Sequence, residues 1–411
     1  MKQRFSKILR WSEKYTKTDM VYVFKNMSFL SGGQFLNSLV TLVFAIFIAN
    51  IFPKEGYGNY KYILSTVALV NSLALTGLGP ALVRAFSKGC DGTLKQFAKI
   101  NFFWAFLPAT ILTALSVYYY VKGNMLLSVG ILVGGLTLPF IERSALHTSV
   151  LNGKKLFKKL SLFSFLRNAI PTLMVAITAY FTLNPLYMAV VYFLSTSIVL
   201  NILYYHTVAV HIENNKVDEE ALHLAKHTSV INIFSLISDQ IDNVIIFQGL
   251  GGTALAIYNF AEAIPNVIQG FVKQVGVIAV PKFVNQDVKT ARETVFRKTL
   301  VLFLASLPVA LLYIVCAPYI FKILFPNYID SVFLSQIMIL GILISSSITI
   351  AFLDSQKAIR AKYILSIVSN VAKIPILILG FYWYGVMGIV IGKLVAKMIG
   401  LCTSLILVKQ V

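Results

Sequence analysis

Charged residues inside long apolar stretches are the side chains of this sequence most able to do chemistry. The basic ones are Arg167, Lys373 and Lys393, and the acidic ones are Asp239, Asp242 and Glu262. A charged side chain at the centre of a membrane-spanning helix costs about 2.5–3.5 kcal/mol, so such residues face one another or a wet cavity. They are therefore the first candidates for a functional site.

The first of two interpretations is structural. Asp239 or Asp242 would form an ion pair with a lysine of the last two apolar stretches and so fasten the C-terminal half of the chain. Lys397 follows Lys393 by four residues and lies on the same helix face. It would extend its ammonium group to the cytoplasmic surface.

The second interpretation is a cationic cavity. Arg167, Lys373 and Lys393 would surround an anionic headgroup, because guanidinium and ammonium groups bind phosphate oxygens and a low dielectric strengthens the attraction. The acidic residues would then be candidates for coupling transport to a proton or another cation. The sequence leaves both interpretations open.

Polar residues on two helix faces extend this set. At an offset of 201 residues, a face of the first apolar stretch corresponds to a face of the seventh, and both have i, i+4, i+7 spacing. The two faces consist of Gln34, Ser38 and Thr41, and of Ser235, Asp239 and Asp242. We predict that both line a cavity and that the two halves form a parallel repeat, as in some transporters.

The sequence lacks the spacing patterns of catalytic and metal sites. Its five histidines have no metal-ligand spacing, and Cys90, Cys316 and Cys402 are expected to be free thiols. No HExxH, GxSxG or glycine-rich phosphate-loop pattern is present. We therefore predict no catalytic residue, no metal and no cofactor, and a protein that is not an enzyme.

The elements that position these residues are expected to be transmembrane helices. Of 411 residues, 57% are hydrophobic and only 13% are charged, whereas a soluble domain carries roughly a quarter charged residues. Apolar runs long enough to cross a hydrocarbon core of about 30 Å recur along the chain. They fall at roughly 28–51, 60–83, 98–120, 124–146, 160–181, 185–206, 228–249, 253–275, 299–320, 331–353, 362–383 and 385–408. The predicted fold is an all-α integral membrane protein with about twelve transmembrane helices.

The distribution of basic residues predicts the orientation of these helices. With the N-terminus in the cytoplasm, 28 of the 36 Lys and Arg residues fall in cytoplasmic connections or at the termini, and four fall in external connections. This asymmetry follows the positive-inside rule and places both termini in the cytoplasm. Basic residues kept in cytoplasmic connections, next to anionic lipid headgroups, also account for the formal net charge of +20. Nucleic acid is therefore not an expected partner.

One polar stretch divides the chain into two sets of six helices. We predict an N-terminal lobe at residues 1–206, which includes a basic cytoplasmic segment at 1–27, then a cytoplasmic linker at 207–227 and a C-terminal lobe at 228–411. No extramembrane segment is long enough to form a domain of its own.

Several short motifs resemble those of a known family. The segment Pro53–Tyr60 (PKEGYGNY) resembles the P-x-E-x-Y-G-x-Y turn of bacterial polysaccharide flippases, and Asp239–Ile246 with Gly251–Tyr258 resembles its counterpart in the second half. Leu151–Lys155 and Leu324–Tyr328 add to the similarity. The family is that of the Wzx-type flippases for O-antigen and capsule repeat units. It lies in the multidrug/oligosaccharidyl-lipid/polysaccharide exporter superfamily, together with multidrug-and-toxin extruders and lipid II flippases. Ile257 departs from the glycine common at that position.

The resemblance implies two six-helix lobes around a central cavity in a multi-pass protein of the bacterial cytoplasmic (inner) membrane. It implies transport, by alternating access, of an undecaprenyl-diphosphate-linked oligosaccharide for lipopolysaccharide O-antigen or capsule synthesis. The expected partners are this polyprenyl-diphosphate-linked substrate and membrane lipids, with the polysaccharide polymerase machinery as a further candidate. Proton or sodium coupling stays open. The alternatives are a cation-coupled multidrug exporter and, from another class, a membrane-embedded glycan polymerase or ligase, for which the external connections are too short.

Overall fold

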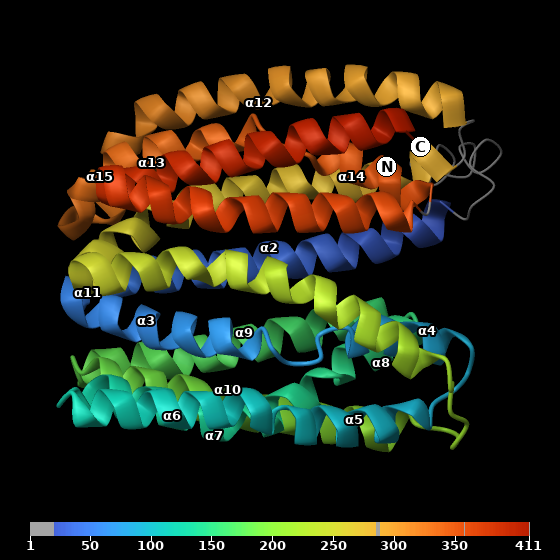
Figure 1. Ribbon diagram of the computed structural model, residues 1–411, viewed down its shortest axis with the longest axis horizontal. Helices are drawn as coiled ribbons and strands as arrows, with labels where there is room; N and C mark the ends of the chain where they lie inside the picture. The colour runs from blue at the N-terminus through green and yellow to red at the C-terminus, as the bar shows by residue number, and fades with distance from the viewer. Residues whose placement is uncertain (1–19, 285–287, 357, 411) are drawn as a thin grey trace. The chain divides into compact units, whose positions relative to one another are not determined.

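The computed structural model of the protein describes residues 20–284, 288–356 and 358–410 (Figure 1). Every regular element within these ranges is a helix, and no strand occurs among them. The all-α fold predicted from the apolar stretches is confirmed.

Contacts divide the described chain into two compact units. The first unit comprises residues 32–256, and the second comprises residues 257–410 together with residues 20–31. The predicted lobes at 1–206 and 228–411 and the linker at 207–227 remain a prediction.

The helices of the first unit follow one another with short connections. They are α2 (Met20–Ile51), which begins in the second unit, α3 (Lys54–Asn71), α4 (Leu78–Ser87), α5 (Thr93–Trp104), α6 (Phe106–Val121), α7 (Met125–Ala145), α8 (His147–Gly153), α9 (Phe157–Phe181), α10 (Pro185–His211) and the first part of α11 (Ala221–Val284).

The second unit begins within α11. Its further elements are α12 (Val288–Leu324), the 3-10 helix η1 (Pro326–Ser331), α13 (Val332–Met338), the 3-10 helix η2 (Ile339–Ile342), α14 (Ser347–Ser355) and α15 (Ile359–Gln410).

Two glycines break the longest helices into separate crossings. Within the described ranges, nine helical stretches are long and apolar enough to cross a membrane, and two of them span 42 and 51 residues. A straight helix of 42 residues would extend roughly 63 Å, about twice the hydrocarbon thickness. Gly251 (φ 80°) breaks α11 and Gly385 (φ 58°) breaks α15. Because side chains other than glycine rarely adopt such positive φ values, these residues set the ends of four crossings.

The second predicted crossing is interrupted. The apolar stretch 60–83 was expected to be one helix, but α3 ends at Asn71 and α4 begins at Leu78. Gly77 lies between them, and its amide donates a hydrogen bond of 2.9 Å to Ser229 Oγ on α11. A Cβ atom at Gly77 would lie 2.2 Å from the carbonyl oxygen of Ala225. The turn therefore permits a close approach of α11 that a regular helix with a larger residue would block.

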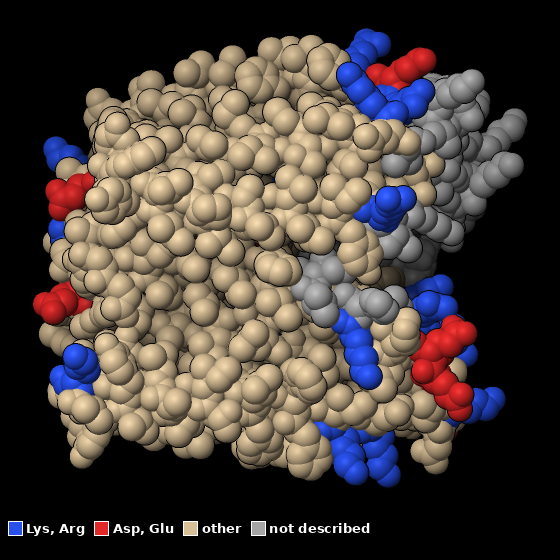
Figure 2. Space-filling model, viewed as in Figure 1, with Lys and Arg blue, Asp and Glu red and all other residues tan. Residues whose placement is uncertain are grey.

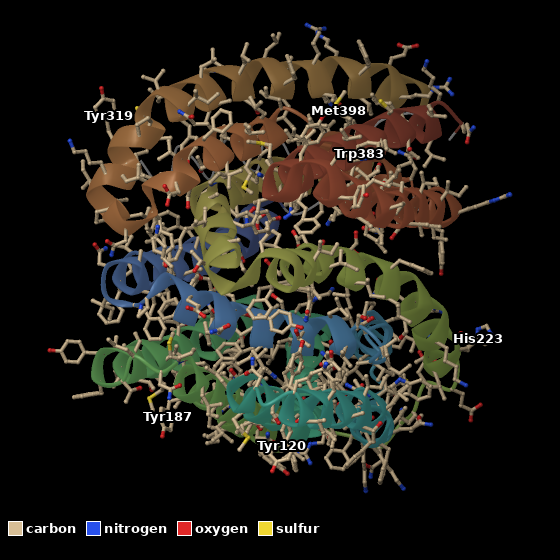
Figure 3. The ribbon with its side chains drawn as sticks, turned by 60° about the vertical axis from the view of Figure 1, so that its left-hand side comes forward. Tyr120, Tyr187, His223, Tyr319, Trp383 and Met398 are labelled. Carbon is tan, nitrogen blue, oxygen red and sulfur yellow. The ribbon has the colours of Figure 1, made fainter. Side chains whose placement is uncertain are left out.

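Charged side chains gather near the ends of the helices. Figure 2 shows Lys, Arg, Asp and Glu at the two ends of the visible face and uncharged side chains over its middle. Exposed aromatic residues lie close to several helix ends, among them Tyr120 and Tyr187 in the first unit (Figure 3), which are 60% and 54% exposed. Both features are typical of multi-pass membrane proteins, in which Trp and Tyr collect at the interfaces.

Polar contacts hold the connecting segment between α10 and α11 (residues 212–220) against the first unit. The buried Asp91 carboxylate accepts hydrogen bonds from Lys154 Nζ at 3.0 Å and from the Glu213 amide at 2.9 Å. Further along, Lys88 Nζ donates to the Asp218 carboxylate at 2.8 Å. The connecting segment is therefore anchored at two points.

Candidate functional site

A cavity of about 740 Å³ lies within the second unit. Its walls come from the second part of α11, from η2, α14 and the segment between them, and from both parts of α15. Apolar side chains form much of the lining, and hydroxyl, amide and ammonium groups are set among them. Charged side chains at membrane depth persist where they face one another or a cavity.

A break in the helix that precedes α14 supplies one wall. The apolar stretch 331–353 was expected to form one continuous helix, but α13, η2 and α14 divide it, and residues 343–346 are not helical. Non-helical backbone at membrane depth is tolerated where it lines a cavity. Ser345 and Ser346 lie in this break and Ser347 begins α14; the hydroxyls of Ser345 and Ser347 are hydrogen-bonded at 2.8 Å.

The break also turns the beginning of a helix toward the cavity. α14 starts at Ser347, and Ser345, Ser346 and Ser347 all belong to the cavity wall. The first amides of a helix have no partner inside it, and the helix dipole places partial positive charge there. An anionic group in the cavity would therefore be stabilised by this terminus as well as by side chains.

The charges around the cavity are predominantly positive. Its described lining contains one carboxylate, Asp354, and five lysines, namely Lys273, Lys362, Lys373, Lys393 and Lys397. Asp354 forms an ion pair with Lys362. Several ammonium groups around one cavity attract an anion, because negative charge between them reduces their mutual repulsion.

Lys393 belongs to a compact polar group on α11 and α15. Its ammonium group forms an ion pair with Glu262 and donates a hydrogen bond of 2.5 Å to the Tyr258 hydroxyl. It also lies 5.0 Å from the centre of the Tyr258 ring, within the range of a cation–π interaction. The Tyr258 hydroxyl donates to Glu262 Oε1 at 3.3 Å. Two side chains of α11 thereby fix Lys393 of α15 at the cavity wall.

Lys397 lies one helical turn further along α15. It donates a hydrogen bond of 2.5 Å to Gln269 Oε1 on α11. A Cβ atom at Gly341 would lie 2.6 Å from Lys397 Nζ, so the glycine leaves room for the ammonium group. Lys397 is therefore part of the cavity lining, whereas the sequence suggested that it would extend to the membrane surface.

Hydroxyl and amide groups on the first part of α15 complete the wall. Ser369 Oγ is buried and has no hydrogen-bond partner in the described part of the chain. Asn370 Nδ2 donates to the Ser366 carbonyl at 2.8 Å, which leaves its amide oxygen as an acceptor near the cavity. A wall with donors and acceptors can bind phosphate oxygens and sugar hydroxyls.

The structure brings together three of the charged residues selected from the sequence. Lys373 and Lys393 line the same cavity, and Glu262 forms the ion pair with Lys393. Arg167 lies on α9 in the first unit, where its side chain is exposed. Its participation in a joint cationic cavity with the two lysines stays a prediction.

The other selected residues belong to the first unit. Asp239 is exposed on α11, and Asp242 is 1% exposed and accepts a hydrogen bond of 2.9 Å from the Asn243 amide. On α2, Gln34 and Thr41 are exposed and Ser38 is half-buried, and on α11 Ser235 is half-buried. The coupling role of the acids and the cavity role of the polar faces stay predictions.

Two parts of the cavity were not expected from the sequence. Lys273 lies near the end of the predicted stretch 253–275 and was not among the selected charged residues, yet it lines the cavity. The serine run 345–347 is the signal that could have located the helix break, since three consecutive serines are unusual in an apolar stretch.

Comparison with a family model gives a match over most of the chain. The model is described as a polysaccharide biosynthesis protein, and it matches residues 23–285. No curated protein sequence matches the chain.

Solved structures with the same fold cover nearly the whole chain. The chain is similar to the lipid II flippase MurJ in an inward closed conformation, with a TM-score of 0.73, 16% identity, and coverage of 92% of this chain and 87% of MurJ. It is similar to an inward-facing multidrug resistance MATE family transporter of the MOP superfamily, with a TM-score of 0.66, 13% identity, and coverage of 91% of this chain and 94% of that transporter. The chain is also similar to a MOP superfamily transporter from Pyrococcus furiosus with reverse polarity of the binding pocket. The TM-score is 0.61 and the identity 13%, with coverage of 94% of this chain and 95% of that transporter.

These similarities establish the architecture. The chain has the fold of twelve helices in two six-helix lobes that MurJ and the MATE transporters share, as predicted from its apolar stretches. At 13–16% identity, the similarity concerns the fold alone.

Proposed function

The chain belongs to the polysaccharide biosynthesis protein family, and on this premise we propose that it is a flippase for lipid-linked oligosaccharides. It moves an undecaprenyl-diphosphate-linked repeat unit from the cytoplasmic to the outer leaflet of the bacterial cytoplasmic membrane. The product serves the synthesis of a surface polysaccharide such as O-antigen or capsule. The two lobes alternate between inward-open and outward-open states, and no covalent bond of the substrate changes.

The cationic cavity of the second unit is the observation that carries this proposal. Five lysines, a helix N-terminus and a serine-rich wall surround a space of about 740 Å³. A diphosphate group brings negative charge and several acceptor oxygens, which these donors satisfy. We assign Lys373 and Lys393 to binding of the diphosphate, and Arg167 of the first unit to the same role in a state in which the lobes approach each other.

The hydroxyl and amide groups suit the sugar portion of the substrate. Ser366, Ser369 and Asn370 offer donors and acceptors on the wall that also carries Lys373. We also assign the polar side chains of Gln34, Ser38, Thr41 and Ser235 in the first unit to the lining of the proposed path.

Acidic residues provide candidate coupling sites. Glu262 holds Lys393 through an ion pair, so protonation of Glu262 would release the lysine toward the substrate. Asp239 and Asp242 on α11 are the corresponding candidates in the first unit for a proton or sodium ion.

Export of organic cations is the second candidate function, because the fold is also that of the MATE transporters. The charge of the cavity disfavours it. A cationic substrate would have to enter a pocket whose described lining contains five lysines and one carboxylate, and that carboxylate is paired with Lys362.

Reconstituted vesicles distinguish the two functions. Purified protein is incorporated into liposomes with a fluorescent polyprenyl-diphosphate oligosaccharide, and its transfer between leaflets is followed with a membrane-impermeant quencher. Parallel vesicles receive a cationic dye and a proton or sodium gradient. Transfer of the lipid-linked oligosaccharide without dye transport supports the flippase, and the opposite pattern would refute it. Formation of a new glycosidic bond would instead identify a polymerase or ligase.

A further inference from the structure

Arg143 on α7 lies in a polar and aromatic site on the surface of the first unit, outside the cavity described above. Its Nη2 donates hydrogen bonds to Asn201 Oδ1 at 2.6 Å and to the Tyr205 hydroxyl at 3.2 Å, both on α10. The guanidinium carbon lies 5.8 Å from the ring centre of Phe102 on α5, 5.5 Å from that of Tyr204 and 5.4 Å from that of Tyr205. Side chains of two other helices, α5 and α10, therefore hold this guanidinium in a defined position.

The charge of Arg143 is not balanced by any of the described side chains. None of their carboxylates lies within ion-pair distance of it, and its Nε atom is buried with no hydrogen-bond partner among them. The adjacent carboxylate of Glu142 points elsewhere, since it accepts a hydrogen bond of 2.8 Å from Asn71 Nδ2 on α3. A guanidinium fixed at a partly buried position without a counter-charge is unfavourable unless an anion joins it.

The surface around this guanidinium is apolar and exposed. Leu136 and Phe140 precede Arg143 at i−7 and i−3 on the same face of α7 and are 60% and 45% exposed. On α10, Ile198 and Ile202 precede Tyr205 in the same spacing and are 59% and 63% exposed. Exposed apolar strips along transmembrane helices are the surfaces that lipid chains cover. Arg143 and Tyr205 thus lie at the end of a lipid-facing strip.

The position of the site along the helices matches a headgroup level. Arg143, Tyr205 and Phe102 lie 18, 20 and 19 residues from the helix ends at Met125, Pro185 and Val121, which the charge distribution predicts to be extracytoplasmic. At about 1.5 Å per residue these separations are roughly 27–30 Å, which is the hydrocarbon thickness. The guanidinium therefore lies where the headgroups of the cytoplasmic leaflet begin. The exposed Lys99 on α5 adds positive charge on that side.

We propose that Arg143, Asn201 and Tyr205 form a binding site for one anionic glycerophospholipid of the cytoplasmic leaflet. The lipid phosphate contacts the guanidinium, while its acyl chains lie along the apolar faces of α7 and α10. The aromatic rings of Phe102 and Tyr204 keep the guanidinium oriented when the site is empty. This site is separate from the proposed substrate path and does not depend on it.

Lipid retention by purified protein tests the proposal. Wild type and the variants Arg143→Gln and Arg143→Lys are titrated in detergent with phosphatidylglycerol or phosphatidylcholine, and bound lipid is counted by native mass spectrometry. Arg84→Gln is the matched control, because Arg84 belongs to the same unit but pairs with Glu220 at 3.5 Å. We expect wild type and Arg84→Gln to bind one phosphatidylglycerol with preference over phosphatidylcholine. Affinity should fall roughly tenfold in Arg143→Gln, because a charge-assisted hydrogen bond is lost. Arg143→Lys should keep the preference.

A measurement on the wild type alone keeps the test decisive if Arg143→Gln does not fold. Phosphatidylglycerol with a photoactivatable group near its headgroup should cross-link to peptides that contain Phe140 or Ile202, whereas the matching phosphatidylcholine should not. Equal retention of both lipids by wild type, unchanged retention by Arg143→Gln, or cross-links located elsewhere would each overturn the proposal. A second copy of the chain bound at this surface would do so as well, and it would appear as a dimer that Arg143→Gln dissociates.

Discussion

The ion pair between Glu262 and Lys393 gives the sharpest prediction about the cavity. We consider three variants, Glu262→Gln, Lys393→Gln and the combination of both. Each glutamine keeps the approximate size of the side chain and removes its charge. Because Tyr258 contacts both residues, the variants also show whether its hydroxyl can hold the remaining partner.

The expected magnitude follows from burial and hydrogen bonding. The side chains of Lys393 and Glu262 are 22% and 20% exposed, so most of each is removed from water. A hydrogen bond to a charged group contributes about 1.5–3 kcal/mol, and loss of one partner from a fully buried pair costs about 3–5 kcal/mol. For this partly exposed pair we expect each single change to lower the free energy of unfolding by about 2–3 kcal/mol. Glu262→Gln should cost less than Lys393→Gln, because Lys393 retains the hydroxyl and ring of Tyr258.

The double variant separates interaction from individual effects. It should lose about 1–3 kcal/mol less than the sum of the two single changes, since neither charge is then left unpaired. Reversible unfolding in mixed micelles measures all four free energies. Lys322→Gln, at an exposed position near the end of α12, is the control and should be neutral. Additive losses, within about 0.5 kcal/mol, would mean that the two residues do not interact and would refute the reasoning.

The helix break in α11 and the contacts of the connecting segment lead to three other expected outcomes. Gly251→Ala should lower the free energy of unfolding by about 1–3 kcal/mol, because φ is 80° there. Gly270→Ala, inside the same helix and with open space for a methyl group, should instead raise it by up to about 1 kcal/mol in the same assay. Asp91→Asn should raise the rate of hydrogen exchange in the connecting segment about tenfold, since it weakens the hydrogen bonds from Lys154 and from the Glu213 amide. An unchanged rate would show that other contacts hold the segment. The hydrogen bond from Lys88 lowers the pKa of the Asp218 carboxyl group. This contact is therefore at full strength above the ordinary aspartate pKa of about 3.9, and it weakens as the pH falls through the lowered pKa of the folded state. After correction for the pH dependence of the intrinsic exchange rate, the protection of the connecting segment should fall over that acidic range in the wild type. In Lys88→Gln the protection should already be low and should depend less on pH.

Much of the fold could be predicted because bilayer crossing imposes a simple rule on length and polarity. Apolar stretches near 228–249 and 253–275 predict two crossings, and the structure separates them at Gly251. Proline does not mark helix ends in this chain as reliably, since Pro171 and Pro375 lie inside helices that continue through them. Glycine determines these ends because it can adopt a positive φ angle. A glycine in this role can be anticipated where two long apolar stretches meet.

The interior of the second unit was less predictable. Apolarity does not distinguish a continuous helix from one that opens at a cavity, so the break at residues 343–346 was missed. The pairing of Glu262 with Lys393 depends on how α11 and α15 pack, and residues 131 positions apart in the chain carry no signal of that register. Composition could indicate that these charges needed partners, and only the packing could identify them.

The most direct test of the central claim is a flipping assay in vesicles, with a polyprenyl-diphosphate oligosaccharide as substrate. The decisive variant is one in which the cationic residues are neutralised together. The variant with Arg167→Gln, Lys373→Gln and Lys393→Gln is compared with the wild type and with Lys322→Gln, at equal amounts of folded protein. The cationic cavity predicts that the triple variant loses transport while Lys322→Gln keeps it. Transport at the wild-type rate by the triple variant would contradict the account.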